Sequence, residues 1–116
     1  MRLRTTLLAL ASTFTLVFAL SGTAHAAQGE FTYYYLDDTG SASPAKLTDP
    51  DNACESIPEL DVDPEAAAFN PSNYTDATAE LYTKDNCGGD LVLTLAPDAH
   101  GNDSHKFRSV KFLPAR

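Results

Sequence analysis

The sequence predicts a small all-β domain, a sandwich or barrel built from short strands. Three observations support this fold class. Apolar and polar residues alternate over short stretches, turn-forming residues separate these stretches at close spacing, and no amphipathic helix of useful length occurs. The predicted strands and turns all follow residue 26. We therefore expect one β-sandwich domain over residues 27–116.

Residues 1–26 are expected to be a secretory signal peptide. Two arginines in the first four residues precede an uncharged apolar run over residues 5–20, and the small-x-small pattern Ala24-His25-Ala26 comes next. The apolar run is short and meets this cleavage pattern at once, which favours a signal peptide over a membrane anchor. We expect a secreted, extracellular protein that begins at Ala27 and has no membrane segment after cleavage.

The first half of the domain is predicted over residues 29–60. It begins with the aromatic, β-prone strand 29–36 (GEFTYYYL). Alternation divides the side chains of this strand between two faces, with Phe31, Tyr33 and Tyr35 on one face and Tyr34 and Leu36 on the other. A turn at 37–40 and a short returning strand at 45–48 follow. The segment 54–60 completes this half, and Pro58 confines it to a sheet edge or a strand end.

The second half is predicted over residues 77–113, after an acidic connection at 61–76 that contains two prolines. Residues 77–83 and 90–95 are expected to form strands on either side of a turn at 84–89. A polar loop at 97–104 then leads to the last strand, 106–113.

Two cysteines, Cys54 and Cys87, are expected to form one structural disulfide. Export to an oxidising compartment makes this pairing the default for a small domain. Closing a loop of this length should stabilise the fold by about 4 kcal/mol on the chain-entropy model.

The charge balance excludes some classes of partner. The whole chain has 8 basic and 16 acidic residues; two arginines leave with the signal peptide, so the mature chain has 6 against 16, a net charge of −10. A field of this sign repels phosphate backbones and anionic membrane surfaces. We therefore expect no nucleic-acid or membrane partner, and we expect a monomer.

A weak internal repeat of about 50 residues relates the two halves. In each half a tyrosine is followed seven residues later by a glycine, and later by a serine next to an aliphatic residue. The residues concerned are Tyr33, Gly40 and Ser56 in the first half, and Tyr82, Gly89 and Ser109 in the second.

This pattern resembles the Greek-key motif of the βγ-crystallin superfamily. The stretch from Ala79 to Phe112 is similar to the second motif of small secreted actinobacterial proteins of this type, whereas the first half matches loosely. The resemblance implies a small Greek-key β-sandwich in which the serine bonds back across a folded hairpin. Relatives include proteins similar to killer toxins and to metalloprotease inhibitors, but a shared fold does not carry an activity.

The resemblance suggests one candidate cofactor, calcium. Asp51 and Asn52, with Ser56 four residues after Asn52, resemble the calcium motif of microbial βγ-crystallins, except that Glu55 stands where serine or threonine is expected. The alternative is an acidic, solvated turn. Any calcium binding is therefore expected to be weak, and we expect no other metal or cofactor.

Two regions are candidate binding surfaces. Tyr34, on the side of its strand opposite Tyr33, could contact a sugar or a protein, or could pack across strands. The last twelve residues contain Lys106, Arg108 and Lys111 and no acid, which indicates either docking of an acidic partner or internal pairing with acidic loops.

No catalytic site is predicted, because the chain contains no nucleophile elbow, His-Glu-x-x-His motif, P-loop or paired cysteine sets for zinc. The leading hypothesis is a non-enzymatic binding module, of inhibitor or antimicrobial type, that acts on an extracellular protein or a cell-envelope target. One alternative is a structural protein of the extracellular or spore surface, and another is a weak calcium-binding crystallin-like protein.

Overall fold

A computed structural model describes residues 27–114, and the expected signal peptide at residues 1–26 lies outside them. The described residues form strands and two single turns of 3-10 helix, without an α-helix. In chain order the elements are β1 (Gly29–Leu36), β2 (Ala42–Thr48), β3 (Cys54–Ser56), η1 (Pro58–Leu60), β4 (Phe69–Thr75), β5 (Ala77–Lys84), η2 (Asp85–Cys87), β6 (Gly88–Leu95) and β7 (Ser109–Pro114). The predicted all-β class is confirmed.

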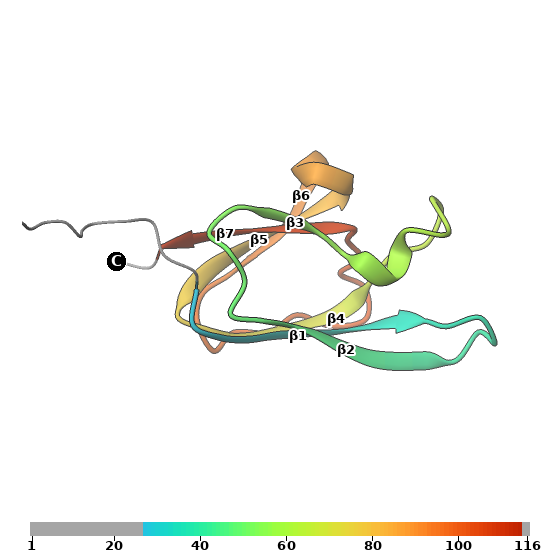
Figure 1. The fold of residues 1–116 in the computed structure, drawn as a ribbon, viewed down its shortest axis with the longest axis horizontal. Helices are drawn as coiled ribbons and strands as arrows, with labels where there is room; N and C mark the ends of the chain where they lie inside the picture. Colours follow the sequence, from blue (N-terminus) through green and yellow to red (C-terminus); the bar gives the residue numbers. More distant parts are fainter. Residues whose placement is uncertain (1–26, 115–116) are drawn as a thin grey trace, which may run out of the picture.

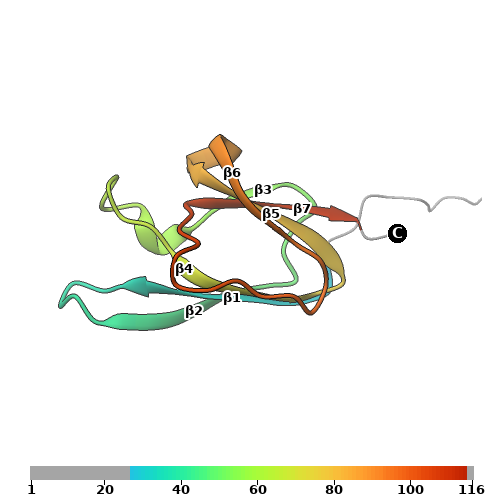
Figure 2. The same ribbon diagram turned by 180° about the vertical axis from the view of Figure 1, so that it is seen from behind.

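The strands form two antiparallel sheets that face each other (Figure 1; Figure 2). The first sheet has the strand order β2-β1-β4, and the second has the order β3-β7-β5-β6. β1 lies between β2 and β4 in the first sheet. In the same way, β5 lies between β6 and β7 in the second sheet.

Each half also contributes its third segment to the sheet of the other half. β3 belongs to the first half but pairs with β7 at the edge of the second sheet. In the opposite direction, the loop before β7 lies along the free edge of β4, with a bridge between Ser72 and His100. The Gly101 N–H donates to the Pro71 carbonyl (2.8 Å) on the same edge. The two halves are thus joined by reciprocal backbone pairing.

The sequence predicts a connection without strands over residues 61–76. This prediction is wrong for the second part of the segment, because Phe69–Thr75 form the strand β4. Pro71 argued against a strand here, since proline cannot donate to a ladder. The structure accommodates it with a bulge: Ser72 pairs with Thr32 and Phe69 pairs with Tyr34, so two residues of β4 lie opposite one of β1. Asn70 adopts φ +54° at this bulge. The first half of the domain therefore extends to residue 75.

The core between the sheets is an aromatic cluster. Phe31 packs edge-to-face on Phe112 (centroids 5.5 Å apart) and on Phe107 (5.9 Å), and Tyr33 packs on Phe107 at 6.2 Å. Aliphatic residues complete the cluster: Ile57, Leu60, Leu81, Leu95 and Val110. The predicted alternation of the first strand is confirmed, because Phe31 and Tyr33 are buried whereas Tyr34 is 38% exposed.

Candidate functional site

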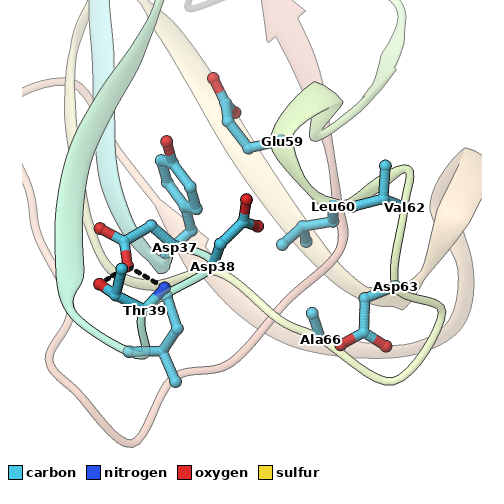
Figure 3. Close-up of a pocket in the computed structure, with 10 residues that line it drawn as sticks. Asp37, Asp38, Thr39, Glu59, Leu60, Val62, Asp63 and Ala66 are labelled. Carbon is cyan, nitrogen blue, oxygen red and sulfur yellow. Dashed lines mark hydrogen bonds between the residues drawn. The ribbon is translucent and has the colours of Figure 1, made fainter.

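An open cleft lies at one end of the sandwich, where the β1–β2 turn and the loop after η1 project side by side (Figure 1). Its volume is about 600 Å³. Residues 35–39 form one wall, and Glu59, Leu60, Val62, Asp63 and Ala66 form the other (Figure 3).

A second hollow of about 480 Å³ adjoins this cleft. The two hollows share Leu36, Asp37, Asp38, Asp63 and Ala66, and the second extends to Phe69 and Lys106. We call the two together the end groove.

The first wall is held in shape by the Asp37 carboxylate. Oδ1 accepts hydrogen bonds from the Thr39 and Ser41 N–H groups (2.9 and 3.0 Å) and from the Thr39 hydroxyl (2.6 Å), and Oδ2 accepts one from the Ser43 hydroxyl. These donors, led by the Thr39 hydroxyl, lower the pKa of Asp37 to about 2. The turn therefore carries a fixed negative charge at the mouth of the end groove.

The low pKa of Asp37 predicts a specific loss of stability in acid. A carboxylate whose folded pKa lies near 2, below its ordinary value of 3.8, stabilises the fold above about pH 4, and this contribution disappears as the pH falls towards 2. Urea melts of an Asp37→Asn variant should show a lower free energy of unfolding at neutral pH, and a gap to wild type that closes over this range. Asp38→Asn serves as the control. A gap that stays constant with pH would contradict the assignment.

The second wall is attached to the core through η1. Leu60 is buried among the core side chains, and the buried Tyr33 hydroxyl donates to Glu59 Oε1 (2.6 Å). Burial and then this hydrogen bond raise the pKa of Tyr33 well above its ordinary value of 10. Tyr33 thus remains a hydrogen-bond donor and holds the Glu59 carboxylate beside the end groove.

Arg108 fixes the rest of this wall and is not a surface residue. Only 8% of it is exposed, and its guanidinium group donates to three backbone carbonyls of the wall: Leu60 (3.2 Å), Asp63 (2.9 Å) and Ala66 (2.6 Å). It also forms an ion pair with Asp85 (3.1 Å). Of the two interpretations of the basic C-terminal residues, Arg108 follows internal pairing with an acidic loop and not docking of a partner, because all of these acceptors belong to the same fold.

The other candidate surface residues lie at two separate places. Tyr34 stacks on Phe69 of the neighbouring strand (centroids 6.3 Å apart, planes at 27°), and Lys106 Nζ lies 5.0 Å from the centre of the Phe69 ring. Tyr34 therefore packs across strands at the border of the end groove. Lys111 is exposed on β7, opposite Cys54 in the second sheet.

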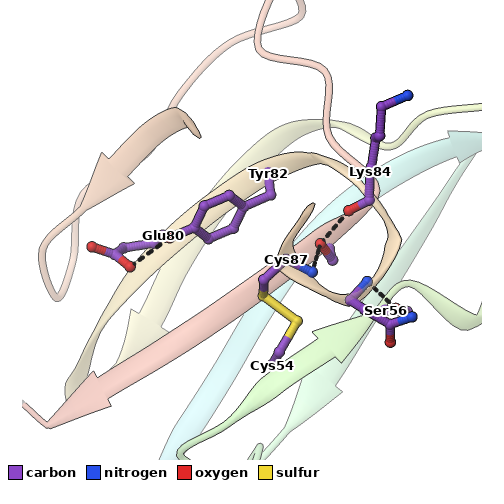
Figure 4. Close-up of a disulfide and its surroundings, with 8 residues drawn as sticks. Cys54, Ser56, Glu80, Tyr82, Lys84 and Cys87 are labelled. Carbon is purple, nitrogen blue, oxygen red and sulfur yellow. Dashed lines mark hydrogen bonds between the residues drawn. A yellow bond between two sulfur atoms is a disulfide. The ribbon is translucent and has the colours of Figure 1, made fainter. Parts of the chain in front are cut away.

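Two of the repeat residues of the second half, Ser109 and Gly89, lie at the β5–β6 corner. The side chain of the third, Tyr82, points to Glu80 (Figure 4). The Ser109 hydroxyl donates to the Lys84 carbonyl and accepts from the Cys87 N–H (2.8 Å), so this serine closes the turn. Gly89 adopts φ +73°, and a Cβ here would collide with the Thr83 hydroxyl. The Tyr82 ring is partly exposed, and its hydroxyl donates to Glu80.

Replacing Gly89 should destabilise the corner more than replacing Gly88. Gly89→Val adds the strain of a left-handed backbone, about 1–3 kcal/mol, and displaces the Thr83 hydroxyl that accepts from the Asp90 N–H. Gly88 has φ −91°, and its Cβ would lie 3.3 Å from the Asp85 carbonyl, so Gly88→Ala should cost less. Thermal melts of the two variants test this order, and equal melting temperatures would refute it.

The first half does not repeat this arrangement. Gly40 adopts φ +83° but has no atom near its Cβ position, and Tyr33 points into the core. The Ser56 hydroxyl accepts from the Asn86 N–H (3.0 Å), in the turn of the second half. The expectation that Ser56 closes the first hairpin is therefore wrong. The reason is topological, because β3 lies in the second sheet, where Ser56 pairs with Ser109.

The predicted disulfide is confirmed. Cys54 of β3 and Cys87 of η2 are bonded (S–S 2.12 Å), which ties the exchanged strand of the first half to the corner of the second (Figure 4). Together with the Ser56, Ser109 and Arg108 contacts, it anchors the 85–87 turn from several directions. Its role in the fold is structural.

Of the two calcium candidates, Asp51 forms a local hydrogen bond from its backbone to a side chain. The Asp51 N–H donates to the Glu55 carboxylate (3.3 Å). Within residues 27–114, no three His, Cys, Asp or Glu residues are grouped so that they could hold a metal ion. The calcium hypothesis rests on the sequence pattern alone.

Sequence reasoning missed the residues of the second groove wall. Residues 61–66 were interpreted as part of a connection, and a single apolar residue between two acids, Val62, was the only local sign of a surface role. Val62 is 87% exposed and Leu36, on the opposite wall, is 58% exposed. Large apolar side chains that remain exposed on both walls of one hollow are typical of an interaction site.

Comparison with known proteins identifies no family for the chain. No family model, curated protein or solved structure shows detectable similarity to the chain. Among residues 27–114, none of the helices has the length and apolar character needed to cross a bilayer.

Proposed function

We propose that the protein is a secreted, non-enzymatic binding module that engages an extracellular protein or a cell-envelope target through the end groove. The single observation that carries this proposal is the exposure of Leu36 and Val62 on facing walls of one hollow. Exposed apolar side chains gain free energy when a partner removes them from water. The disulfide supports the extracellular setting, since such bonds persist in oxidising compartments.

The rigidity of the groove walls favours binding over a purely structural role. One wall is closed by the Asp37 turn, and the other is held by Arg108 and by the contact between Tyr33 and Glu59. Walls that are already in place lose little conformational entropy when a partner binds.

We further propose that the fold is a pair of Greek keys of the βγ-crystallin type. The support is the matching order of β2-β1-β4 and β6-β5-β7 and the exchange of third segments between the halves. In the second half, Ser109 and Gly89 also meet at the hairpin corner, in agreement with the resemblance. The first half supports it less, because Ser56 does not close its own hairpin.

Affinity capture tests the binding role. Immobilised mature protein is incubated with culture supernatant and with cell-envelope preparations, alongside a Leu36→Ser/Val62→Ser variant. Losing both apolar contacts should reduce capture at least about tenfold, since each buried CH₂ group contributes about 0.8 kcal/mol.

The matched control is Leu91→Ser/Tyr74→Ser, which removes two exposed apolar side chains that do not line the groove. It should capture the same material as wild type. Equal capture by all three proteins would refute the proposed site.

A further inference from the structure

The first hollow of the end groove combines apolar walls with negative charge, whereas Lys106 lines the second hollow. The apolar side chains are Tyr35 and Leu36 on one wall and Leu60, Val62 and Ala66 on the other. Carboxylates from both walls surround them: Asp37, Asp38, Glu59 and Asp63. The first hollow has no basic side chain in its lining, and Asp37 keeps its charge down to about pH 2. A ligand that buries Leu36 and Val62 must therefore also lie among carboxylates.

This combination restricts the chemistry of the ligand. An anionic or phosphate-bearing ligand would be repelled, and a neutral apolar ligand would leave the carboxylates beside it partly desolvated without a partner. A lysine or arginine next to an apolar side chain satisfies both features, because the cation pairs with a carboxylate while its stem covers apolar surface. The hollow of about 600 Å³ is of the size that holds a drug-sized molecule or a short run of side chains.

We infer, building on the binding role proposed above, that the end groove receives an extended segment of a protein partner in which leucine-like residues lie beside lysine or arginine. Leu36 and Val62 contact the apolar residues of the segment, and Asp38 and Asp63 pair with its cations. The complementarity is therefore two-sided: the apolar contacts supply affinity, and the carboxylates select the sign of the neighbouring charge.

The inference is tested with three synthetic nine-residue peptides and the ¹⁵N-labelled mature protein at physiological salt. One peptide alternates leucine and lysine, a second alternates serine and lysine with the same charge, and a third alternates leucine and glutamate. The leucine–lysine peptide should shift the backbone amide signals of Leu36, Thr39, Val62 and Ala66 saturably. The other two should bind at least about tenfold more weakly, a difference of 1.4 kcal/mol.

Single variants then separate the two parts of the site. Val62→Ser should weaken binding of the leucine–lysine peptide about tenfold. Asp38→Asn should weaken it by up to about fivefold, as expected for an exposed ion pair. Leu91→Ser and Asp90→Asn make comparable changes on β6, outside the groove, and should leave the affinity within about twofold. The amide spectra of the variants also show directly whether each is folded.

Several outcomes would overturn the inference. Equal affinity for the two lysine peptides would show general attraction to the acidic mature chain, which has 6 basic and 16 acidic residues. Shifts away from the groove residues, or tight binding of the leucine–glutamate peptide, would refute it as well. Groove shifts with fully deacetylated chito-hexaose but not with the peptides would assign a cationic glycan instead.

The inference and the proposed function can fail separately. If no peptide binds but capture of envelope material still depends on Leu36 and Val62, the binding role stands and the peptide chemistry is wrong. If capture is also independent of these two residues, both proposals fail.

Discussion

An Arg108→Met variant is expected to lose about 3–5 kcal/mol of its free energy of unfolding. Methionine retains much of the aliphatic stem but removes every donor of the guanidinium group. The carbonyls of Leu60, Asp63 and Ala66 then lose a charged partner, and Asp85 loses its ion pair. Each of the three carbonyl groups that loses its charged donor costs about 1–3 kcal/mol where it stays buried. The Asp85 side chain is 51% exposed, so its lost ion pair adds little.

Denaturant melts measure this loss, and Lys111→Met is the matched control because it removes an exposed cation from β7, the strand that begins directly after Arg108. The control should stay within about 0.5 kcal/mol of wild type. Hydrogen exchange adds a local measurement: the amides of Asp63 and Ala66 should exchange faster in Arg108→Met than in wild type, beyond the change in global stability. A loss below about 1 kcal/mol would show that water replaces the guanidinium contacts.

Asn73→Asp is expected to destabilise the fold by at least about 3 kcal/mol at neutral pH. Asn73 is fully buried in β4, and its amide nitrogen donates to the carbonyls of Ala77 (2.8 Å) and Leu95 (3.0 Å). Its amide oxygen accepts from the N–H and the hydroxyl of Thr75 (3.1 and 2.7 Å). Aspartate would place a buried negative charge against carbonyl oxygens and lose both donors, each worth about 1–3 kcal/mol.

The pH dependence of this variant distinguishes charge from lost hydrogen bonds. Burial raises the pKa of an aspartate, so the added penalty should appear as the pH rises above its unfolded value of about 4. Asn73→Asp should therefore be closer to wild type near pH 4 than at pH 7, whereas Asn73→Ala should lose a similar amount at both. Tyr74→Ala, at an exposed neighbouring position, is the control. A loss for Asn73→Asp that does not change with pH would contradict this account.

The parts of the fold that sequence reasoning predicted are those that local patterns determine. β1 was predicted at its observed bounds, because a run of aromatic residues is β-prone and an acidic turn follows it directly. The disulfide was predictable because two cysteines allow one pairing. The hairpin of β5 and β6 followed from a polar, glycine-containing turn between two β-prone stretches.

Features that depend on distant residues could not be predicted. β4 was missed because a bulge absorbs Pro71, and the bulge exists only through pairing with β1. In a regular β6 strand, Leu91 and Leu95 would lie on the same face. A shift in register beside Tyr82 instead leaves Leu91 52% exposed, whereas Leu95 is buried.

The groove wall at 60–66 depends on Arg108, more than forty residues away. No short stretch of sequence contains that relation. For the same reason the sequence left docking and internal pairing open for Arg108, and only the fold shows that its acceptors are internal.

The pairing around Asp76 has a practical consequence for how the protein can be attached to a surface or to another polypeptide. The Asp76 N–H donates to the Gln28 carbonyl, and Pro114 pairs with Ala77, so the first and last described residues leave the fold next to each other. They do so at the end of the sandwich away from the β1–β2 turn (Figure 1). A fusion or an immobilising tag at either terminus should attach the molecule at the end opposite the groove and leave the groove accessible to solvent. The protein is therefore suited to display on a solid support or at the tip of a larger chain.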